Sequence, residues 1–183
     1  MKKRNKWSID SYVPTESDKV IFDTNVLINI FYPINFSKNT SKYEEFYTKL
    51  LDKRVEIYLS SIQVSEFINR CIRFRFSVFS DGKKLDFKRD YRETEDYCSH
   101  MEGILDIINS DIIPNFSFID DGFSDMDYEN IFKYGFSYDF NDALISEIAK
   151  RKDAYLITHD SDFLNYGSDL KLITANKGLL RFE

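Results

Sequence analysis

Four short apolar runs, none longer than five residues, place the strongest constraint on how this chain folds. They lie at residues 19–22 (KVIF), 56–59 (EIYL), 154–158 (AYLIT) and 170–174 (LKLIT). Each run is too short for a helix, and runs without polar alternation are typical of strands that are covered on both faces. The chain is therefore expected to build a parallel sheet between layers of helices.

Helical spacing of apolar residues fills much of the sequence between these runs. Helices are expected at four places: residues 43–51, a segment beginning after Ser60, residues 94–113 and residues 140–151. Ser60 and Gln63 have the spacing of a capping box, and Pro114 is expected to end the third helix. Residues 115–119 are either an extra strand or an extended link. This order of elements predicts a three-layer α/β/α sandwich with a central, mainly parallel sheet and an expanded helical middle.

Length and composition favour one soluble globular domain. The 183 residues are 43% hydrophobic and 31% charged, without a repeat or a linker that would divide residues 1–183. No apolar run is long enough to cross a bilayer, and the basic N-terminus is not followed by the apolar segment of a signal peptide. Cys71 and Cys98 have neither metal-ligand spacing nor the density of a disulfide scaffold. These features predict a cytoplasmic protein with no membrane partner.

Charge is distributed in blocks, although the net charge of −6 is modest. Residues 70–92 contain eight Lys or Arg against three Asp, whereas residues 93–130 contain eleven Asp or Glu and no Lys or Arg. The basic block is either a phosphate-binding surface with aromatic side chains for unpaired bases, or a solvated pair of helices with those aromatics in the core. The acidic block is a solvated loop, a contact for a basic partner, or a surface that prevents RNA from binding in the wrong place.

Three arginines in the basic block are candidates for RNA binding: Arg70, Arg73 and Arg75. Arg70 and Arg73 follow Glu66 by four and seven residues, so helical spacing places all three side chains on roughly one face. Arg75 continues the positive track.

Four acids are expected to meet at one edge of the sheet. Asp23 and Asp160 follow predicted strands, and Glu66 and Asp142 lie near the starts of helices that face the same edge. Functional crevices of open parallel sheets lie at the carboxyl ends of the strands. Carboxylates gathered there repel each other unless cations balance them, and oxygen-only ligands select Mg²⁺ or Mn²⁺. The chemistry that such a site supports is metal-assisted hydrolysis of a phosphodiester.

Three of these acids also have ordinary structural interpretations. Asp23 could begin a turn, Asp142 suits the first turn of a helix, and Asp160 could cap a short helix. Glu66 has no such role, because Ser60 and Gln63 already serve the cap. The metal-site hypothesis therefore rests on the four acids together and not on any one of them.

Four motifs in this order resemble the PIN domain, the nuclease fold of many toxin–antitoxin ribonucleases of the VapC type. They are VIFDTNVLI at residues 20–28, SSIQVSE at 60–66, NDALI at 141–145 and LITHDSDF at 156–163. The resemblance extends from residue 19 to about residue 175. It implies an endoribonuclease with one or two Mg²⁺ or Mn²⁺ ions, a homodimer and an antitoxin partner.

The resemblance also implies roles for individual residues. It makes four acids both catalytic and metal-binding, namely Asp23, Glu66, Asp142 and Asp160. Asp162 is an additional candidate ligand, and the supporting residues are Thr24, Asn25, Asp139 and Thr158. The chain departs from compact VapC-like toxins in an N-terminal extension at residues 1–18 and an expanded insert at about residues 75–135.

Two alternative functions are weighed against the nuclease. A PIN fold that binds RNA or protein without cutting is the first, although such a module has no reason to keep a repulsive cluster of acids. A haloacid-dehalogenase-like phosphatase also opens with an Asp after a strand. That family requires a second Asp two residues later, where this chain has Asn25.

Overall fold

The computed structural model describes residues 5–33, 38–135, 139–165 and 169–181. Its centre is a six-stranded sheet with the order β1-β6-β5-β2-β3-β4, in which all neighbouring strands are parallel. The strands are β1 (Lys6–Ser8), β2 (Lys19–Phe22), β3 (Glu56–Ser60), β4 (Ser117–Ile119), β5 (Tyr155–Ile157) and β6 (Lys171–Thr174). The predicted parallel sheet is confirmed, and residues 115–119 contribute an edge strand to it.

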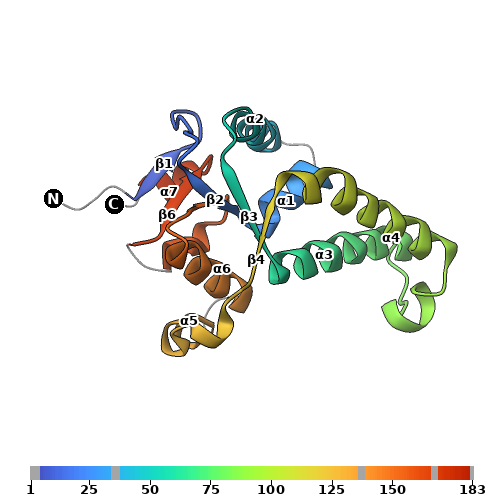
Figure 1. Cartoon of the computed structure of the whole chain (residues 1–183). Helices are drawn as coiled ribbons and strands as arrows, with labels where there is room; N and C mark the ends of the chain where they lie inside the picture. Colours follow the sequence, from blue (N-terminus) through green and yellow to red (C-terminus); the bar gives the residue numbers. More distant parts are fainter. Residues whose placement is uncertain (1–4, 34–37, 136–138, 166–168, 182–183) are drawn as a thin grey trace.

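Helices cover both faces of the sheet (Figure 1). One layer consists of α1 (Thr24–Phe31), α2 (Lys38–Asp52), α3 (Ser61–Ser80) and α4 (Glu95–Ile107). The other consists of α5 (Tyr128–Gly135), α6 (Phe140–Arg151) and α7 (Lys177–Arg181). Successive residues of β2 alternate between the layers: Val20 and Phe22 pack under the first, and Ile21 under the second. This double burial explains why the strand reads as a continuous apolar run.

The structure corrects several predicted boundaries. The third predicted helix, residues 94–113, is α-helical only to Ile107 and continues as a π-helical turn (Ile108–Ile112) and a 3₁₀ turn (Ile113–Asn115). Pro114 lies in that last turn, where it has no N–H to donate to the preceding turn. Helices α1, α5 and α7 and strand β1 were not predicted from the sequence. They are short, with eight residues at most, so their periodicity is weak.

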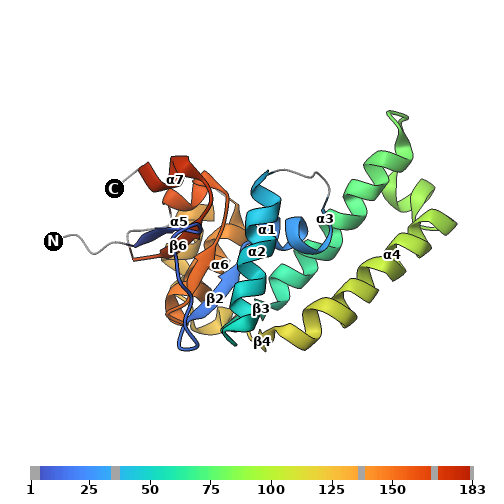
Figure 2. The same ribbon diagram turned by 90° about the horizontal axis from the view of Figure 1, so that it is seen from above.

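Helices α3 and α4 lie side by side and project from the sheet as an arm (Figures 1 and 2). A cluster of rings joins the two helices to the segment between them, consisting of Phe76, Phe79, Phe87, Tyr91 and Tyr97. Phe87 and Tyr91 are buried. Most aromatics of the basic block therefore form the core of the arm, in agreement with the second interpretation of that block. Within the described residues, no helix has the length and apolar character needed to cross a membrane.

Candidate active site

Asp23 and Asp160 lie near each other because β2 and β5 are neighbouring parallel strands. Phe22 pairs with Ile157 at the end of this ladder, and the backbone N–H of Asp23 donates to the Ile157 carbonyl at 2.9 Å. The residues that follow both strands consequently emerge at the same edge of the sheet. The sequence predicted that these two acids would lie at the carboxyl ends of the strands.

Asp23 is the most deeply buried of the four acids, with 3% of its surface exposed. Its Oδ1 accepts from the Asn25 N–H at 3.1 Å and caps α1, and its Oδ2 accepts from the Thr158 hydroxyl at 2.8 Å. Burial, followed by the charges of Asp160 and Glu66, raises the pKa of Asp23 to about 6, although both hydrogen bonds act in the opposite direction. The Asp23 side chain thus caps α1, and burial together with the neighbouring acids disfavours its ionised form.

Glu66 is fixed by donors on two helices. Its Oε2 accepts from the Thr24 hydroxyl at 2.9 Å, and its Oε1 lies 3.3 Å from Nη1 of Arg70. The start of α3 is joined to the end of β2 by Gln63, whose Nε2 donates to the Phe22 carbonyl at 2.6 Å. The other end of the Gln63 amide accepts from the N–H of Ser60, so the predicted reciprocal pair forms. The helix cap therefore also positions Glu66 beside the Asp23 loop.

Asp142 approaches from the opposite layer, in the first turn of α6. The N-cap of that helix is Asp139, whose Oδ1 accepts from the Asn141 N–H at 2.8 Å. Burial first, and then the charges of Asp23, Asp139, Asp160 and Glu66, raises the pKa of Asp142 to about 8. The favourable helix dipole at this position is therefore outweighed by desolvation and repulsion.

The loop after β5 carries Asp160 and Asp162. The Asp160 N–H donates to the Thr158 hydroxyl at 2.9 Å, and Asp160 Oδ1 accepts from the Asp162 N–H at 2.9 Å. Asp160 thus precedes and caps the 3₁₀ turn Ser161–Asn165, as its structural interpretation expected. Asp162 is exposed. Thr158 links Asp23 and Asp160 through a single buried hydroxyl.

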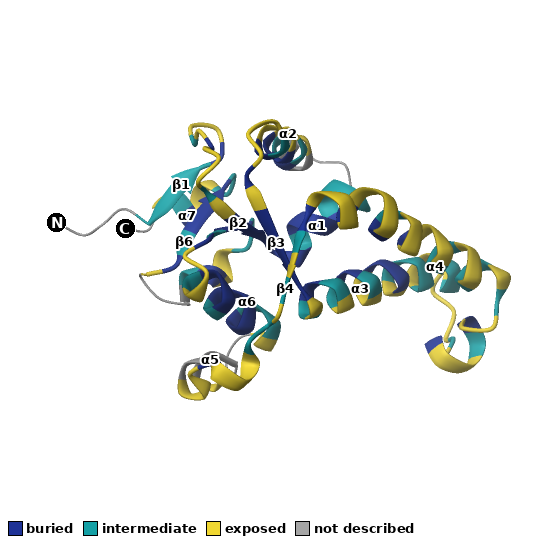
Figure 3. Ribbon diagram, in the orientation of Figure 1, coloured by how far each residue is buried: buried dark blue, intermediate teal, exposed yellow. Residues whose placement is uncertain are grey.

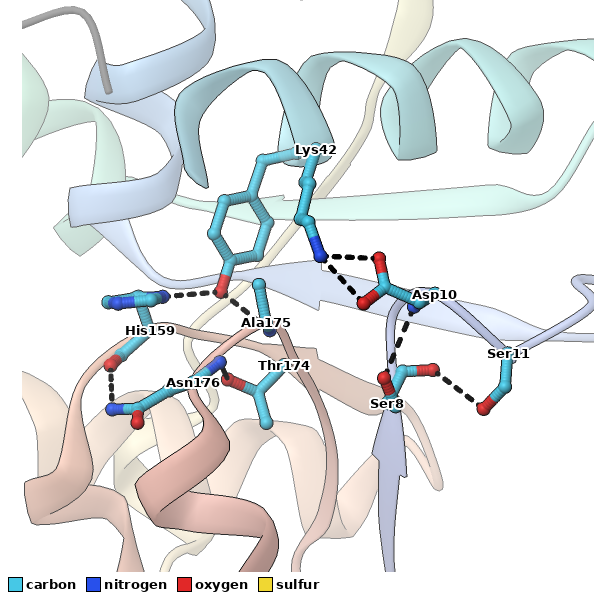
Figure 4. A network of polar contacts seen from close by, with 9 residues as sticks. Ser8, Asp10, Ser11, Lys42, His159, Thr174, Ala175 and Asn176 are labelled. Carbon is cyan, nitrogen blue, oxygen red and sulfur yellow. Dashed lines mark hydrogen bonds and ion pairs between the residues drawn. The ribbon is translucent and has the colours of Figure 1, made fainter. Parts of the chain in front are cut away.

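Tyr43 and Asn176 also hold this loop, and the sequence did not single them out. The buried Tyr43 hydroxyl donates to the Thr158 carbonyl at 3.0 Å and lies 3.1 Å from Nδ1 of His159. The Asn176 amide donates to the His159 carbonyl at 2.8 Å (Figure 4). Tyr43 looks like an ordinary apolar position of α2, and its partners are more than 100 residues away. No local pattern could have revealed this contact.

The three candidate arginines differ in their surroundings. Arg70 Nη1 lies 3.3 Å from the carboxylate of Glu66. The Arg73 guanidinium sits over the Phe87 ring at 3.9 Å, and Arg75 makes two hydrogen bonds of 2.7 and 3.2 Å to Asp96 of α4. Arg75 therefore connects α3 to α4 within the arm. Arg70 and Arg73 are exposed, whereas Arg75 is partly buried.

The donor chemistry of the site fits a hard divalent cation. All four acids offer oxygen ligands. Burial first, and then the charges of neighbouring acids, disfavours the ionised forms of Asp23 and Asp142, and a cation would offset both effects. The side chains nevertheless interact through charge without converging. Among the residues that the structure describes, no three Asp, Glu, His or Cys side chains are arranged so that they could hold an ion.

Replacing Thr158 with Val is expected to weaken both stability and metal binding. The change removes the hydroxyl that donates to Asp23 and accepts from Asp160, and an unsatisfied buried group costs about 1–3 kcal/mol. Loss of such a supporting hydrogen bond lowers metal affinity about 10- to 100-fold. Thermal unfolding and Mn²⁺ titration by calorimetry would measure both effects. Thr158→Ser, which keeps the hydroxyl, is the matched control, and equal behaviour of the Val and Ser variants would contradict the prediction.

Comparisons with known proteins agree with the fold. A sequence model of the PIN domain matches residues 20–169. No curated protein matches this chain. Among solved structures, FitAB bound to an IR36 DNA fragment is 19% identical, with a TM-score of 0.50 over 85% of this chain and 94% of that one.

Two further solved structures are similar at slightly lower TM-scores. VapBC2 from Rickettsia felis, bound to a DNA fragment from its promoter, is 19% identical, with a TM-score of 0.49 over 85% of this chain and 98% of that one. FitAcB from Neisseria gonorrhoeae is 18% identical, with a TM-score of 0.48 over 84% of this chain and 96% of that one. The family match spans most of the chain, including all four acids. The chain therefore belongs to the PIN domain family.

Proposed function

We propose that this protein is an Mg²⁺- or Mn²⁺-dependent endoribonuclease that hydrolyses RNA phosphodiester bonds. The observation that carries the proposal is the charge coupling among Asp23, Glu66, Asp142 and Asp160. These acids come from separate elements in both helical layers. Burial first, and then the charges of Asp23, Asp139, Asp160 and Glu66, raises the pKa of Asp142 to about 8. Without a cation, repulsion among these partly buried carboxylates would only destabilise the folded protein.

One or two divalent cations, when bound, would neutralise these carboxylates and stabilise the charge that develops on the phosphoryl oxygens. Asp23, Glu66, Asp142 and Asp160 would hold them once their side chains moved closer together, because no three described side chains are placed to hold an ion in this structure. The exposed Asp162 is a further candidate ligand. Thr24, Asn25 and Thr158 keep the oxygens of Glu66 and Asp23 in fixed orientations through the hydrogen bonds described above. Asp139 caps α6 and thereby sets the direction from which Asp142 approaches.

RNA would enter beside Arg70 and Arg73. Arg70 is 46% exposed in its side chain despite its contact with Glu66, so its remaining donors can reach a phosphate next to the acids. Arg73 lies about one turn further along α3, away from the sheet. Arg75 would act indirectly, because its contact with Asp96 orients the arm that carries the other two.

We also infer that the protein acts in the cytoplasm as the toxin of a toxin–antitoxin pair and forms a homodimer. The motifs at residues 20–28, 60–66, 141–145 and 156–163 support this inference through their resemblance to VapC-type ribonucleases. A PIN fold that binds RNA without cutting is the alternative. The two proposals differ in whether metal binding is accompanied by turnover.

The decisive experiment is cleavage of a labelled total-RNA pool by the purified protein in Mg²⁺, in Mn²⁺ and in EDTA. Cleavage is expected with either metal and not with EDTA, and Asp23→Asn should abolish it. Asp52→Asn, at the exposed end of α2, is the charge-matched control and should cleave normally. Full activity of Asp23→Asn would reject the assigned site. Mn²⁺ binding without cleavage of any RNA would favour the non-catalytic module.

A further inference from the structure

Four large aromatic side chains lie exposed around the start of α6. They are Phe123, Tyr128, Phe132 and Phe140, with 41%, 45%, 53% and 36% of their surfaces exposed. These four residues, called the aromatic patch below, belong to a 3₁₀ turn, α5 and the first residue of α6. Exposed residues dominate this part of the molecule (Figure 3), whereas the ring cluster of the arm is centred on the buried Phe87 and Tyr91.

The rings of the aromatic patch contact one another. Phe123 lies 5.3 Å from Tyr128 and 6.3 Å from Phe140, and the rings of Phe132 and Phe140 are stacked at 6.1 Å. Mutual contact fixes the rings before any partner arrives, so binding would cost little side-chain entropy. Contiguous exposed apolar surface of this kind is typical of interaction sites, where Tyr and Phe often serve as anchors.

The surroundings of the aromatic patch are strongly acidic. Residues 120–142 contain seven Asp or Glu and one Lys, a net charge of −6. Asp125, which lies between Phe123 and Tyr128 in the sequence, has 73% of its side chain exposed and forms a long ion pair of 4.0 Å with Arg151. Glu129 is exposed as well. This rim would repel the phosphates of a nucleic acid, which makes RNA a poor occupant despite the four rings.

We propose that the aromatic patch binds a protein segment whose apolar side chains are flanked by lysine or arginine. Apolar groups of the segment would cover the four rings, and its cations would pair with acids such as Asp125 and Glu129. A second copy of this chain fits poorly, because a two-fold contact would place each acidic rim against its own copy. The proposal does not rest on the nuclease function, although the patch adjoins Asp142 through Phe140.

Binding to designed peptides tests this proposal directly. The probe is a fluorescein-labelled helical peptide of about 16 residues that carries Leu and Trp on one face, flanked by Arg. Fluorescence anisotropy should show saturable binding that weakens as salt is added. Two matched peptides should bind much more weakly, one with Glu in place of Arg and one with Ser in place of Leu and Trp.

Two protein variants locate the binding site. Phe132→Ser should lower the affinity for the Arg peptide by about tenfold or more, whereas Val78→Ser, which changes an exposed residue of α3, should leave the affinity unchanged. Asp125→Asn combined with Glu129→Gln should reduce both the affinity and its salt dependence. Circular dichroism would show whether each variant keeps the native fold.

Three outcomes would overturn the proposal. The first is equal binding of the Arg and Glu peptides, and the second is unchanged affinity in both patch variants. The third is evidence that RNA or a second copy of this chain binds the patch. Phe132→Ser would then lose binding to an oligouridine RNA, or would convert a dimer into a monomer in analytical ultracentrifugation. All of these measurements can be made with the wild-type acids in place and EDTA present, so failure of the nuclease proposal would remain distinguishable from failure of this one.

Discussion

Replacing Asp142 with Asn is expected to abolish RNA cleavage and, without metal, to make the protein more stable. The pKa of Asp142 is raised to about 8, mainly by burial and then by the charges of Asp23, Asp139, Asp160 and Glu66. At pH 8.5 the wild-type protein must keep this carboxylate ionised against desolvation and repulsion. Asn has nearly the same shape and no charge, so both costs disappear.

The expected increase in Tm for Asp142→Asn in EDTA at pH 8.5 is roughly 2–4 °C, the change that about 1 kcal/mol produces in a chain of this length. Cleavage should fall by roughly 100- to 1,000-fold or more, because a group that stabilises the transition state is lost. Glu95→Gln is the matched control, since Glu95 is an exposed acid in the first turn of α4. That variant loses only a favourable helix-dipole interaction and should be slightly less stable. For Asp142→Asn, a Tm below that of the wild-type protein would contradict the claim that the ionised Asp142 side chain destabilises the fold.

Stability of the metal-free protein is expected to fall as pH rises from about 5 to 9. The pKa values of Asp142 and Asp23 are raised from 3.8 to about 8 and about 6, so the folded protein binds protons that the unfolded chain has already released. Stability from these two protons is fully present below pH 4 and is lost first through pH 6 and then through pH 8. Thermal unfolding in EDTA across this range would show the decrease.

Divalent cations should reverse this pH dependence. Bound Mn²⁺ or Mg²⁺ favours the ionised carboxylates, so saturating metal should raise the Tm more at pH 8.5 than at pH 5.5. Asp142→Asn should remove most of the upper part of the pH dependence in EDTA and leave the part due to Asp23. A Tm that rises between pH 5 and pH 9 in EDTA would contradict the expected ionisation of both groups.

The resemblance at four motifs and the order of elements were sufficient to predict the fold. The runs at residues 19–22 and 154–158 predicted two strands of a parallel sheet, and the structure shows that these strands are neighbours, with Phe22 of β2 paired with Ile157 of β5. This success has a local cause, because a strand buried on both faces must be apolar at every position. The family match over residues 20–169 confirms the PIN domain, while the catalytic roles of the four acids remain predictions.

Local patterns also determined several details near the site. The Ser60–Gln63 capping box forms as predicted, since the spacing of three residues suffices to bring these groups together at a helix start. Asp142 and Asp160 occupy the first-turn and cap positions that their neighbours indicated, whereas Asp23, which was expected to begin a turn, caps α1. In each case the partner lies within a few residues, and the backbone geometry of one turn sets the contact.

Tertiary structure alone decided which distant side chains meet. Arg75 looked like a third RNA-binding arginine until α4 placed Asp96 against it, and Tyr43 gained its role because α2 lies above the loop after β5. The same holds for the aromatic patch, whose rings are apolar enough for a core but remain exposed beside α6. Sequence spacing determines which residues share a face of a helix or strand. What that face meets depends on how the layers pack, and hence on contacts between residues far apart in the chain.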